Sequence, residues 1–243
     1  MELREGEQLD DLQYDGLKIL QKKDAFRYGT DGVLLANYAA KGIFESRLLQ
    51  KRKDAMPIRM LDIGTGCGII PILLCGKLHA DAQTVQLRGA EIQVDVAEMA
   101  RRSVLLNGQE AQISIDIGDV RTLPYESASF DVITMNPPYV RKNAGLLSDS
   151  VAVATACHEC VCTQEELIAR AAALIRPRGL FYMINKPDRL TDALSAMREN
   201  RLEPWEIRFV QSRADTAPVL FLVYGVRCGG KGLRVPAPIL LER

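Results

Sequence analysis

The sequence has no excess of charge of either sign and no long apolar run. Its 243 residues carry 31 lysines and arginines against 31 aspartates and glutamates, so the formal net charge is zero. A zero net charge excludes an unstructured basic nucleic-acid binder, for which a large positive charge is usual. No apolar run approaches the roughly 18–20 residues that a membrane span needs. The acidic, polar start over residues 1–7 also lacks the apolar segment of a secretory signal peptide.

The sequence also lacks the cysteine pattern of a secreted, disulfide-stabilised protein. Its six cysteines are unevenly spaced and follow no secretory signal, so we expect reduced thiols in a cytoplasmic protein. Four candidate zinc ligands, Cys157, His158, Cys160 and Cys162, crowd together within one short run. Structural zinc sites usually draw on two separated pairs of ligands. We therefore expect no metal site.

The overall composition is that of a folded protein. Hydrophobic residues make up 47% and charged residues 26%, with a mean hydropathy of −0.03, so we expect one large domain with a sizeable core.

The two signs of charge separate along the chain. Residues 1–169 carry 18 basic and 24 acidic side chains, whereas residues 170–243 carry 13 and 7. Such a basic part fits an anionic partner, but on charge alone an ordinary solvated surface is favoured.

From residue 58 onward, short apolar runs alternate with amphipathic runs, which is typical of βαβ units. We therefore predict one α/β domain with a mostly parallel, doubly wound sheet. Capping boxes are expected at Asp95 with Glu98 and at Thr163 with Glu166. The last two strands are too close for a crossover helix and predict an antiparallel pair. The predicted strands cover residues 58–63, 84–91, 112–117, 130–135, 180–184, 205–210 and 219–226. The predicted helices cover residues 69–78, 96–107, the run from Thr163 to a stop at Pro177 and Gly179, and residues 188–199.

A glycine-rich turn follows the first predicted strand, in the run Leu-Asp-Ile-Gly-Thr-Gly-Cys-Gly over residues 61–68. Glycines at a strand-to-helix turn permit a tight backbone and let a ligand approach closely. The spacing G-x-G-x-G is one residue shorter than the dinucleotide fingerprint G-x-G-x-x-G. The turn therefore favours a nucleoside without a pyrophosphate, although by itself such a turn can serve packing alone.

Two acidic residues strengthen the interpretation as a nucleoside site. Glu91 ends the second predicted strand, where a carboxylate can accept both hydroxyls of a ribose, and Asp119 follows the third, where it can accept from an adenine amine. Ligands of open α/β sheets bind outside the carboxyl ends of the strands. Each acid alone fits an exposed loop residue or a helix cap better, but the three features together favour a ligand.

The run Asn136-Pro137-Pro138-Tyr139 comes directly after the fourth predicted strand. Its two prolines remove two backbone donors, so the loop cannot extend the strand and leaves carbonyls free. The Asn136 side chain and the Pro137 backbone each offer a carbonyl oxygen, and together they can accept both hydrogens of an exocyclic NH2 group. Tyr139 can stack on a flat amide or base.

With this run, the sequence resembles the class I S-adenosylmethionine methyltransferases that act on planar amino groups. Their glycine turn and Asn-Pro-Pro-Tyr run occur here in the same order and spacing. Residues 26–36 and 185–190 resemble, more specifically, the bacterial tRNA1(Val) adenine-N6 methyltransferase family. The resemblance extends over residues 8–241. It departs at Cys157, where the family's Ala-Arg-His-Glu reads Ala-Cys-His-Glu, and any substrate contact made by that arginine is absent.

The resemblance implies a single Rossmann-like domain with a seven-stranded, mostly parallel sheet, an antiparallel C-terminal strand pair and helices on both faces. Residues 1–57 would cap the cofactor, S-adenosylmethionine, and residues 58–243 would form the core. Asp31 would lie near the methionine ammonium of the cofactor and Ile92 against its adenine. The implied cofactor residues are Tyr28, Thr30, Asp31, Asp62, Gly64, Gly66, Glu91, Ile92, Asp119, Val120 and Asn136.

The implied reaction is direct methyl transfer from a sulfonium to the N6 amine of an adenine in tRNA, at the purine 3′ of the anticodon of a valine tRNA. The implied catalytic residues are Asn136, Pro137 and Tyr139. The implied substrate-binding residues are Pro138, Tyr139, Arg141 and Lys142. The two basic residues fit either phosphates beside a flipped base or an exposed basic pair. Nothing in the sequence indicates a membrane or an obligate protein partner.

Other functions stay open on the motif alone. Release-factor methyltransferases, which act on a glutamine amide, carry the same Asn-Pro-Pro-Tyr run, and guanine-N2 methyltransferases of ribosomal RNA are close relatives. The glutamine enzymes also have a separate helical domain, whereas only about 57 residues precede the first predicted core strand here. A non-enzymatic nucleotide- or RNA-binding module has no need of paired acceptors for a reacting amine.

Overall fold

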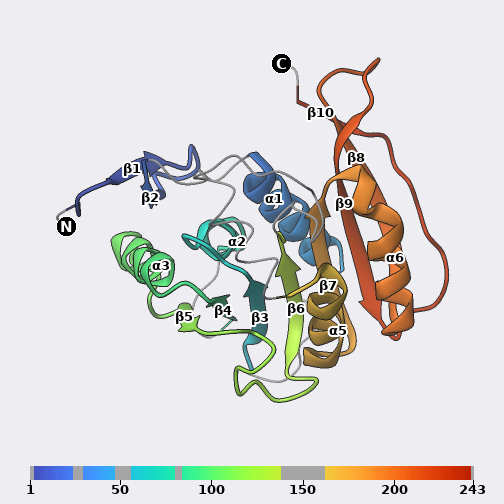
Figure 1. The fold of residues 1–243 in the computed structure, drawn as a ribbon, viewed down its shortest axis with the longest axis horizontal. Coiled ribbons are helices and arrows are strands. Elements are labelled where there is room, and N and C mark those ends of the chain that lie inside the picture. The colour runs from blue at the N-terminus through green and yellow to red at the C-terminus, as the bar shows by residue number, and fades with distance from the viewer. Residues whose placement is uncertain (1–2, 24–29, 47–55, 80–83, 138–161, 242–243) are drawn as a thin grey trace. The chain divides into compact units, whose positions relative to one another are not determined.

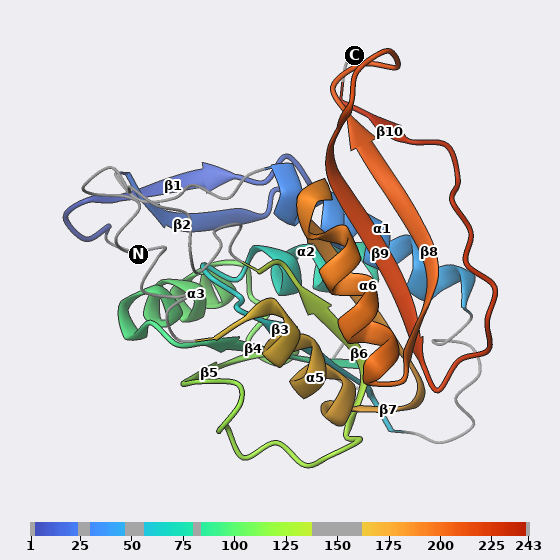
Figure 2. The ribbon, with the colours of Figure 1, turned by 45° about the vertical axis from the view of Figure 1, so that its right-hand side comes forward.

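A computed structural model describes residues 3–23, 30–46, 56–79, 84–137 and 162–241. Contacts between residues divide the chain into two units. Figures 1 and 2 draw the helices and strands of the chain as ribbons. The first unit comprises residues 1–124 and 130–135, and the second comprises residues 125–129 and 136–243. The expected single domain therefore stays a prediction.

Four parallel strands form the centre of the first unit. They are β3 (Ile58–Ile63), β4 (Val85–Glu91), β5 (Ile113–Ile117) and β6 (Phe130–Met135), in the order β6-β3-β4-β5. Every residue of β6 is buried, and so is all of β3 except Arg59. This nearly continuous burial is the reason why these two strands read as mainly apolar runs. The four strands match the sequence prediction to within one residue at each end.

Three helices complete the first unit: α1 (Thr30–Glu45), α2 (Ile69–Lys77) and α3 (Val94–Leu106). Helix α2 follows β3 and α3 follows β4, as βαβ units require. Helix α1 packs on α2. A side chain in place of Gly32 would put its Cβ 3.1 Å from Ile69, so the glycine permits this close approach.

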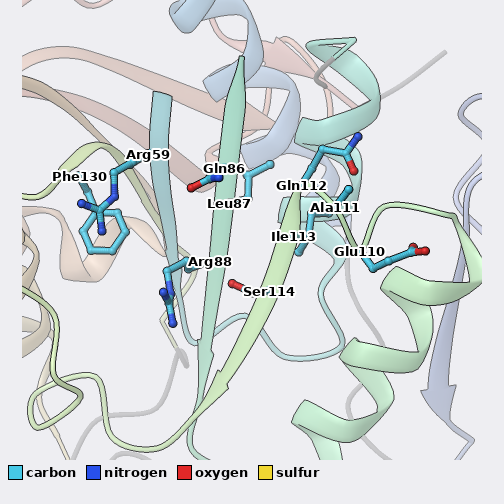
Figure 3. A pocket seen from close by; sticks show the side chains of 10 residues that line it. All are labelled: Arg59, Gln86, Leu87, Arg88, Glu110, Ala111, Gln112, Ile113, Ser114 and Phe130. Carbon is cyan, nitrogen blue, oxygen red and sulfur yellow. The ribbon is translucent and has the colours of Figure 1, made fainter. Parts of the chain in front are cut away.

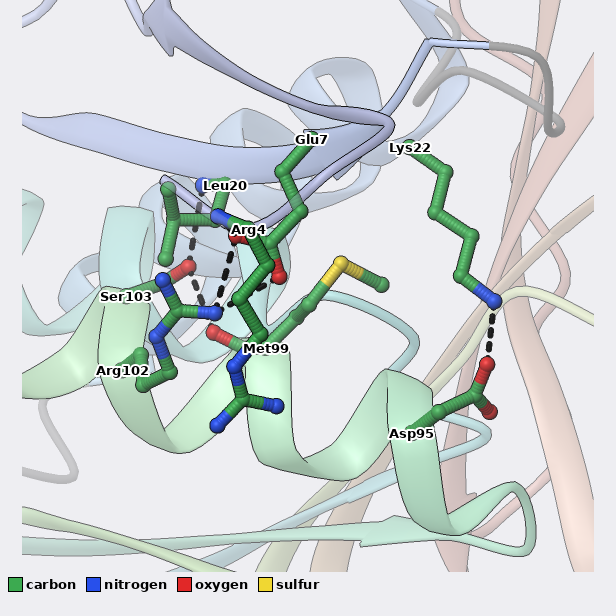
Figure 4. Close-up of polar contacts among 8 residues, drawn as sticks. All are labelled: Arg4, Glu7, Leu20, Lys22, Asp95, Met99, Arg102 and Ser103. Atoms are coloured by element: carbon green, nitrogen blue, oxygen red, sulfur yellow. Dashed lines mark hydrogen bonds and ion pairs between the residues drawn. The ribbon is translucent and has the colours of Figure 1, made fainter. Parts of the chain in front are cut away.

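The first unit also contains a hairpin that the sequence did not predict, formed by β1 (Glu7–Asp11) and β2 (Lys18–Lys22). Its contacts with α3 are drawn in Figure 4. Arg102 of α3 donates to both carboxylate oxygens of Glu7, at 2.6 and 2.9 Å, and the Ser103 hydroxyl accepts from the backbone N–H of Leu20 at 3.0 Å. These partners are about 80 to 95 residues apart in sequence, so no local pattern predicts the hairpin.

The start of α3 corrects one prediction. The residue that caps this helix is Gln93, and Asp95 lies inside the first turn. The predicted capping box at Asp95 with Glu98 is therefore wrong. The physical reason is a distant partner, because the carboxylate of Asp95 bonds to the ammonium of Lys22 on β2 (Figure 4). That hydrogen bond also lowers the pKa of Asp95.

The described residues of the second unit form mostly antiparallel strands and two α-helices. Its elements are α5 (Gln164–Leu174), β7 (Ile175–Asn185), a 3-10 turn η1 (Pro187–Arg189), α6 (Leu190–Glu199), β8 (Leu202–Gln211), β9 (Pro218–Arg227) and β10 (Ile239–Leu240). Strand β9 pairs antiparallel with both β7 and β8, while β10 pairs parallel with β8. The predicted antiparallel pair near the C-terminus is confirmed as β8 and β9.

The helix that precedes β7 confirms one prediction and corrects another. Thr163 and Glu166 form the predicted capping box, in which each side chain accepts the other residue's backbone N–H. The predicted stop at Pro177 is wrong, because α5 ends at Leu174 and β7 begins at the next residue. Proline is tolerated near the start of a strand where no neighbour needs its N–H. Pairing with β9 begins only at Leu180.

Candidate functional site

The glycine turn lies at the carboxyl end of β3, where the sequence placed it. Gly64, Gly66 and Gly68 have φ angles of 68°, 56° and 89°, a backbone conformation that favours glycine. A Cβ built on Gly64 or Gly66 would meet no atom of the described residues within 4 Å. The protein itself therefore leaves open space over these two residues, and the turn can accept a ligand that approaches the backbone closely.

Glu91, the last residue of β4, holds this turn in place. It is 5% exposed. One carboxylate oxygen, Oε2, accepts from the backbone N–H of Gly66 at 3.0 Å, and the other, Oε1, accepts from that of Gln93 at 3.0 Å. Each oxygen has a second lone pair for a ligand donor. Ile92, which the sequence places against a base, follows Glu91 and is 38% exposed.

Asp62 is a buried carboxylate one residue before the end of β3. It is 1% exposed, its Oδ1 accepts from the hydroxyl of Thr134 at 2.6 Å, and among the described residues its Oδ2 makes no well-formed hydrogen bond. Burial raises the pKa of Asp62 to about 7, the hydroxyls of Thr134 and, more weakly, Thr65 oppose this rise, and the charge of Glu91 adds to it. A buried carboxylate oxygen without a well-formed hydrogen bond is energetically costly, so its presence indicates a function.

Asp119, the predicted acceptor for an adenine amine, bonds to its neighbour Arg121. Its Oδ1 accepts from the Arg121 backbone N–H at 2.9 Å, and its Oδ2 accepts from the guanidinium Nη2 at 2.7 Å. The hydrogen bond from the Arg121 side chain holds the pKa of Asp119 below its usual range. The role in binding an amine stays a prediction. Val120, between the two, is buried.

The first turn of α1 contains two of the predicted cofactor residues. Asp31 is 6% exposed and its Oδ1 accepts from the backbone N–H of Gly32 at 3.0 Å. Thr30 is the first residue of the helix and is exposed. Tyr28 lies outside the described residues, so its predicted contact stays a prediction.

Asn136 and Pro137 follow directly on β6 in the chain and belong to the second unit. Asn136 is half-buried and Pro137 is buried. Pro138, Tyr139, Arg141 and Lys142 lie outside the described residues, as do Cys157, His158 and Cys160. In the described part of the chain, no group of three or more His, Cys, Asp or Glu side chains could hold a metal ion. Within the same part, no helix is long and apolar enough to cross a membrane.

Sequence reasoning missed Thr134, because a threonine in a strand reads first as a β-former. The positions of Thr134 and Asp62 in the sequence nevertheless indicated a contact between them. Thr134 and Asp62 are each the last but one residue of neighbouring parallel strands, and the register places them directly opposite each other. Polar residues at matching positions of two buried apolar strands indicate a buried hydrogen bond.

A pocket of about 230 Å³ lies at the other end of the same strands (Figure 3). Its lining includes Arg59, Gln86 and Ile113, which are near the amino ends of β3, β4 and β5. Arg88, also in the lining, makes a bidentate ion pair with Asp116, at 2.6 and 2.7 Å. None of the predicted site residues lines this pocket. The candidate site therefore stays at the carboxyl ends of the strands, where ligands of open α/β sheets bind.

Comparison with known proteins identifies proteins of similar sequence and solved structures of similar fold. Over 172 residues the chain is 32% identical to a tRNA1(Val) (adenine(37)-N6)-methyltransferase of Porphyromonas gingivalis, a match that covers 69% of this chain but only 62% of that relative. A protein of the same name from Phocaeicola vulgatus is 28% identical over 195 residues, 80% of this chain and 74% of that relative. The fold resembles a predicted O-methyltransferase from Agrobacterium tumefaciens, with a TM-score of 0.63 at 22% identity over 87% of this chain and 88% of that one.

A family model described as "Methyltransferase domain" matches residues 56–216. The matched segment runs from just before β3 into the loop after β8, and so includes the glycine turn and the Asn-Pro-Pro-Tyr run. The match covers more than half of the chain, and the structural neighbours have the Rossmann-like α/β fold that the sequence predicted. The chain therefore belongs to the methyltransferase-domain family, with the class I fold.

Proposed function

We propose that this protein transfers a methyl group from S-adenosylmethionine to the N6 amine of an adenine in tRNA, at the purine 3′ of the anticodon of a valine tRNA. The observation that carries the proposal is the Asn-Pro-Pro-Tyr run placed directly after β6, the strand that pairs in register with the strand leading into the glycine turn. The names of the sequence relatives support the choice of tRNA. We also expect the enzyme to act in the cytoplasm, where its tRNA is found.

The residues at the carboxyl ends of β3 and β4 fit S-adenosylmethionine. The open space over Gly64 and Gly66 leaves room for it beside the backbone. Glu91 keeps lone pairs for the ribose hydroxyls, and the exposed Ile92 offers an apolar surface to the adenine. When bound, S-adenosylmethionine supplies an electrophilic methyl group on a sulfonium.

Asn136 and Pro137 would hold the target amine. The lone pair of an adenine amine is delocalised into the ring, which makes it a poor nucleophile. Two carbonyl acceptors, the Asn136 side chain and the Pro137 backbone, bind both amine hydrogens and favour a pyramidal nitrogen whose lone pair can attack. Tyr139 would stack on the target adenine once that base has left the stack of RNA bases. Most of the rate enhancement then comes from position and oriented dipoles, without a charged general base.

The proposal is tested by methyl transfer to tRNA that lacks the modification, followed by nucleoside analysis. We expect N6-methyladenosine, and we expect Asn136→Ala to reduce the transfer rate at least about a hundredfold, since a group that positions the reacting amine is lost. S-adenosylmethionine binding, measured by calorimetry, shows whether that variant still folds around its cofactor. Methylation of guanine or of a protein glutamine instead of adenine would overturn the substrate assignment. A near wild-type rate in Asn136→Ala would contradict the catalytic assignment.

A further inference from the structure

The hydrogen bond between Thr134 and Asp62 lies beneath the glycine turn and links two strands. Both side chains are almost fully buried, at 2% and 1% exposed, and the donor and acceptor oxygens are 2.6 Å apart. The two residues are register partners, on β6 and β3. Two residues beyond Asp62, the chain enters the turn, and two residues beyond Thr134 it reaches Asn136.

We propose that Thr134 is a positioning residue, whose hydroxyl holds the Asp62 carboxylate beneath the glycine turn as a fixed negative charge for a cationic cofactor. This inference rests on the proposed function, because S-adenosylmethionine carries a positive sulfonium and an ammonium. A charge in a buried, low-dielectric setting acts more strongly than one in water. Asp62 therefore need not touch the cofactor to attract it.

The surroundings of Asp62 show why it needs this hydroxyl. Burial is the largest influence on the carboxylate, and it favours the neutral acid; the charge of Glu91 on β4 acts in the same direction. The hydrogen bond from Thr134 favours the ionised form and has the largest effect in that direction, ahead of the Thr65 hydroxyl. Of the other titratable groups around the turn, burial raises the pKa of the Cys67 thiol to about 11, so it is neutral in the same range. Asp31, on α1, bonds to its own helix.

The charge of Asp62 determines how the affinity for S-adenosylmethionine should change with pH. Asp62 loses its charge as the pH falls through its pKa of about 7, so affinity for a cationic cofactor should fall with it. Removal of the Thr134 hydroxyl disfavours the ionised form further. The midpoint of the affinity profile should then move to higher pH.

The test compares Thr134→Val, which keeps the shape but removes the donor, with Thr134→Ser, which keeps the donor. S-adenosylmethionine binding is measured by calorimetry between about pH 6 and about pH 9, a range that includes the pKa of about 7 for Asp62. We expect Thr134→Val to weaken binding about tenfold near neutral pH and to raise the midpoint, and Thr134→Ser to restore both. In an Asp62→Asn background, Thr134→Val should have almost no further effect on binding.

Binding of a neutral ligand distinguishes a positioning role of Thr134 from a general loss of structure in the variant. 5′-Methylthioadenosine has the nucleoside part of the cofactor but no charge, so its affinity should be the same in Thr134→Val as in the wild type. Equal weakening of both ligands would assign Thr134 a structural role and overturn the inference, as would unchanged S-adenosylmethionine binding. Wild-type protein that binds no S-adenosylmethionine at all would instead overturn the proposed function.

Discussion

At the scale of single residues, the acidic groups of the candidate site bond to the backbone or to neighbouring side chains. Glu91 accepts two backbone N–H groups, Asp119 bonds to Arg121, and Asp62 accepts from Thr134. The sequence predicts Glu91 and Asp119 because they end or follow an apolar run, whereas Asp62 is implied by the family resemblance. It does not predict their partners, since those depend on how the turn folds back and on the register between strands.

The backbone contacts of Glu91 lead to a prediction about two substitutions. Glu91→Ala removes the acceptor of both N–H groups, so it should lower the free energy of unfolding by roughly 1–3 kcal/mol as well as weaken S-adenosylmethionine binding. Glu91→Gln keeps one acceptor oxygen and should lose less of both. Denaturant unfolding and calorimetry measure the two effects. Affinity for tRNA should change far less, and an equal loss of tRNA and cofactor binding would count against the assigned role.

At the scale of elements, the parallel strands were predictable and the hairpin was not. Strands β3 and β6 are buried along nearly all of their length, and this burial appears in the sequence as apolar runs with clear ends. The sequence of β1, Glu-Gln-Leu-Asp-Asp, is a poor strand former by itself. Its partners on α3 decide its structure. The start of β7 was misread for a related reason, because a proline usually ends a helix but is also tolerated at the start of a strand.

The ion pair between Glu7 and Arg102 gives a prediction about the hairpin. The side chains are only 6% and 15% exposed, so Glu7→Gln, which leaves the Arg102 charge uncompensated, should lower the free energy of unfolding by about 2–4 kcal/mol at pH 7. The pair between Lys22 and Asp95 is 46% and 59% exposed. Asp95→Asn is the matched control and should cost about 0–1 kcal/mol. Denaturant unfolding of the two variants measures the difference.

The same ion pair predicts the direction of an acid effect. Burial would raise the pKa of Glu7, but the hydrogen bonds from Arg102 and from the Arg4 backbone lower it below the usual value of 4.5. A carboxylate with a lowered pKa contributes stability above its usual pKa, and that contribution disappears as the pH falls through the lowered value. The difference between wild type and Glu7→Gln should therefore shrink below pH 4.5. A difference that stays constant into acid would show that the charge is not responsible.

At the scale of the whole molecule, the zero net charge conceals an uneven distribution. The predicted cofactor residues all lie in the acidic part of the sequence, before residue 170, and the excess of arginine lies after it. This distribution, together with Arg141 and Lys142, fits a protein that binds a nucleoside with one part and a polyanion with the other. Sequence composition predicts that division, but it does not identify which arginines contact RNA.

The charge distribution predicts different salt dependences for the two ligands. Affinity for tRNA should fall about tenfold or more between about 50 and 200 mM salt, because contacts with phosphates release counterions. Affinity for S-adenosylmethionine should change much less. Filter binding and calorimetry over one salt series measure both. The double variant Arg141→Ala/Lys142→Ala should give a shallower slope for tRNA, and a tRNA affinity that does not depend on salt would contradict the proposed contacts with phosphate.

The last strand of the first unit, β6, follows a short segment of the second unit in the sequence. Residues 125–129 belong to the second unit, and only then does the chain return to supply β6, residues 130–135, beside β3. During synthesis, a nascent chain that ends at Pro124 therefore has the glycine turn but exposes an apolar edge of β3. Because the first unit consists of two separate segments of the chain, cleavage of a single peptide bond cannot separate the two units. We expect the cofactor site to form only after Met135 has left the ribosome, when β6 and Thr134 can pair with β3.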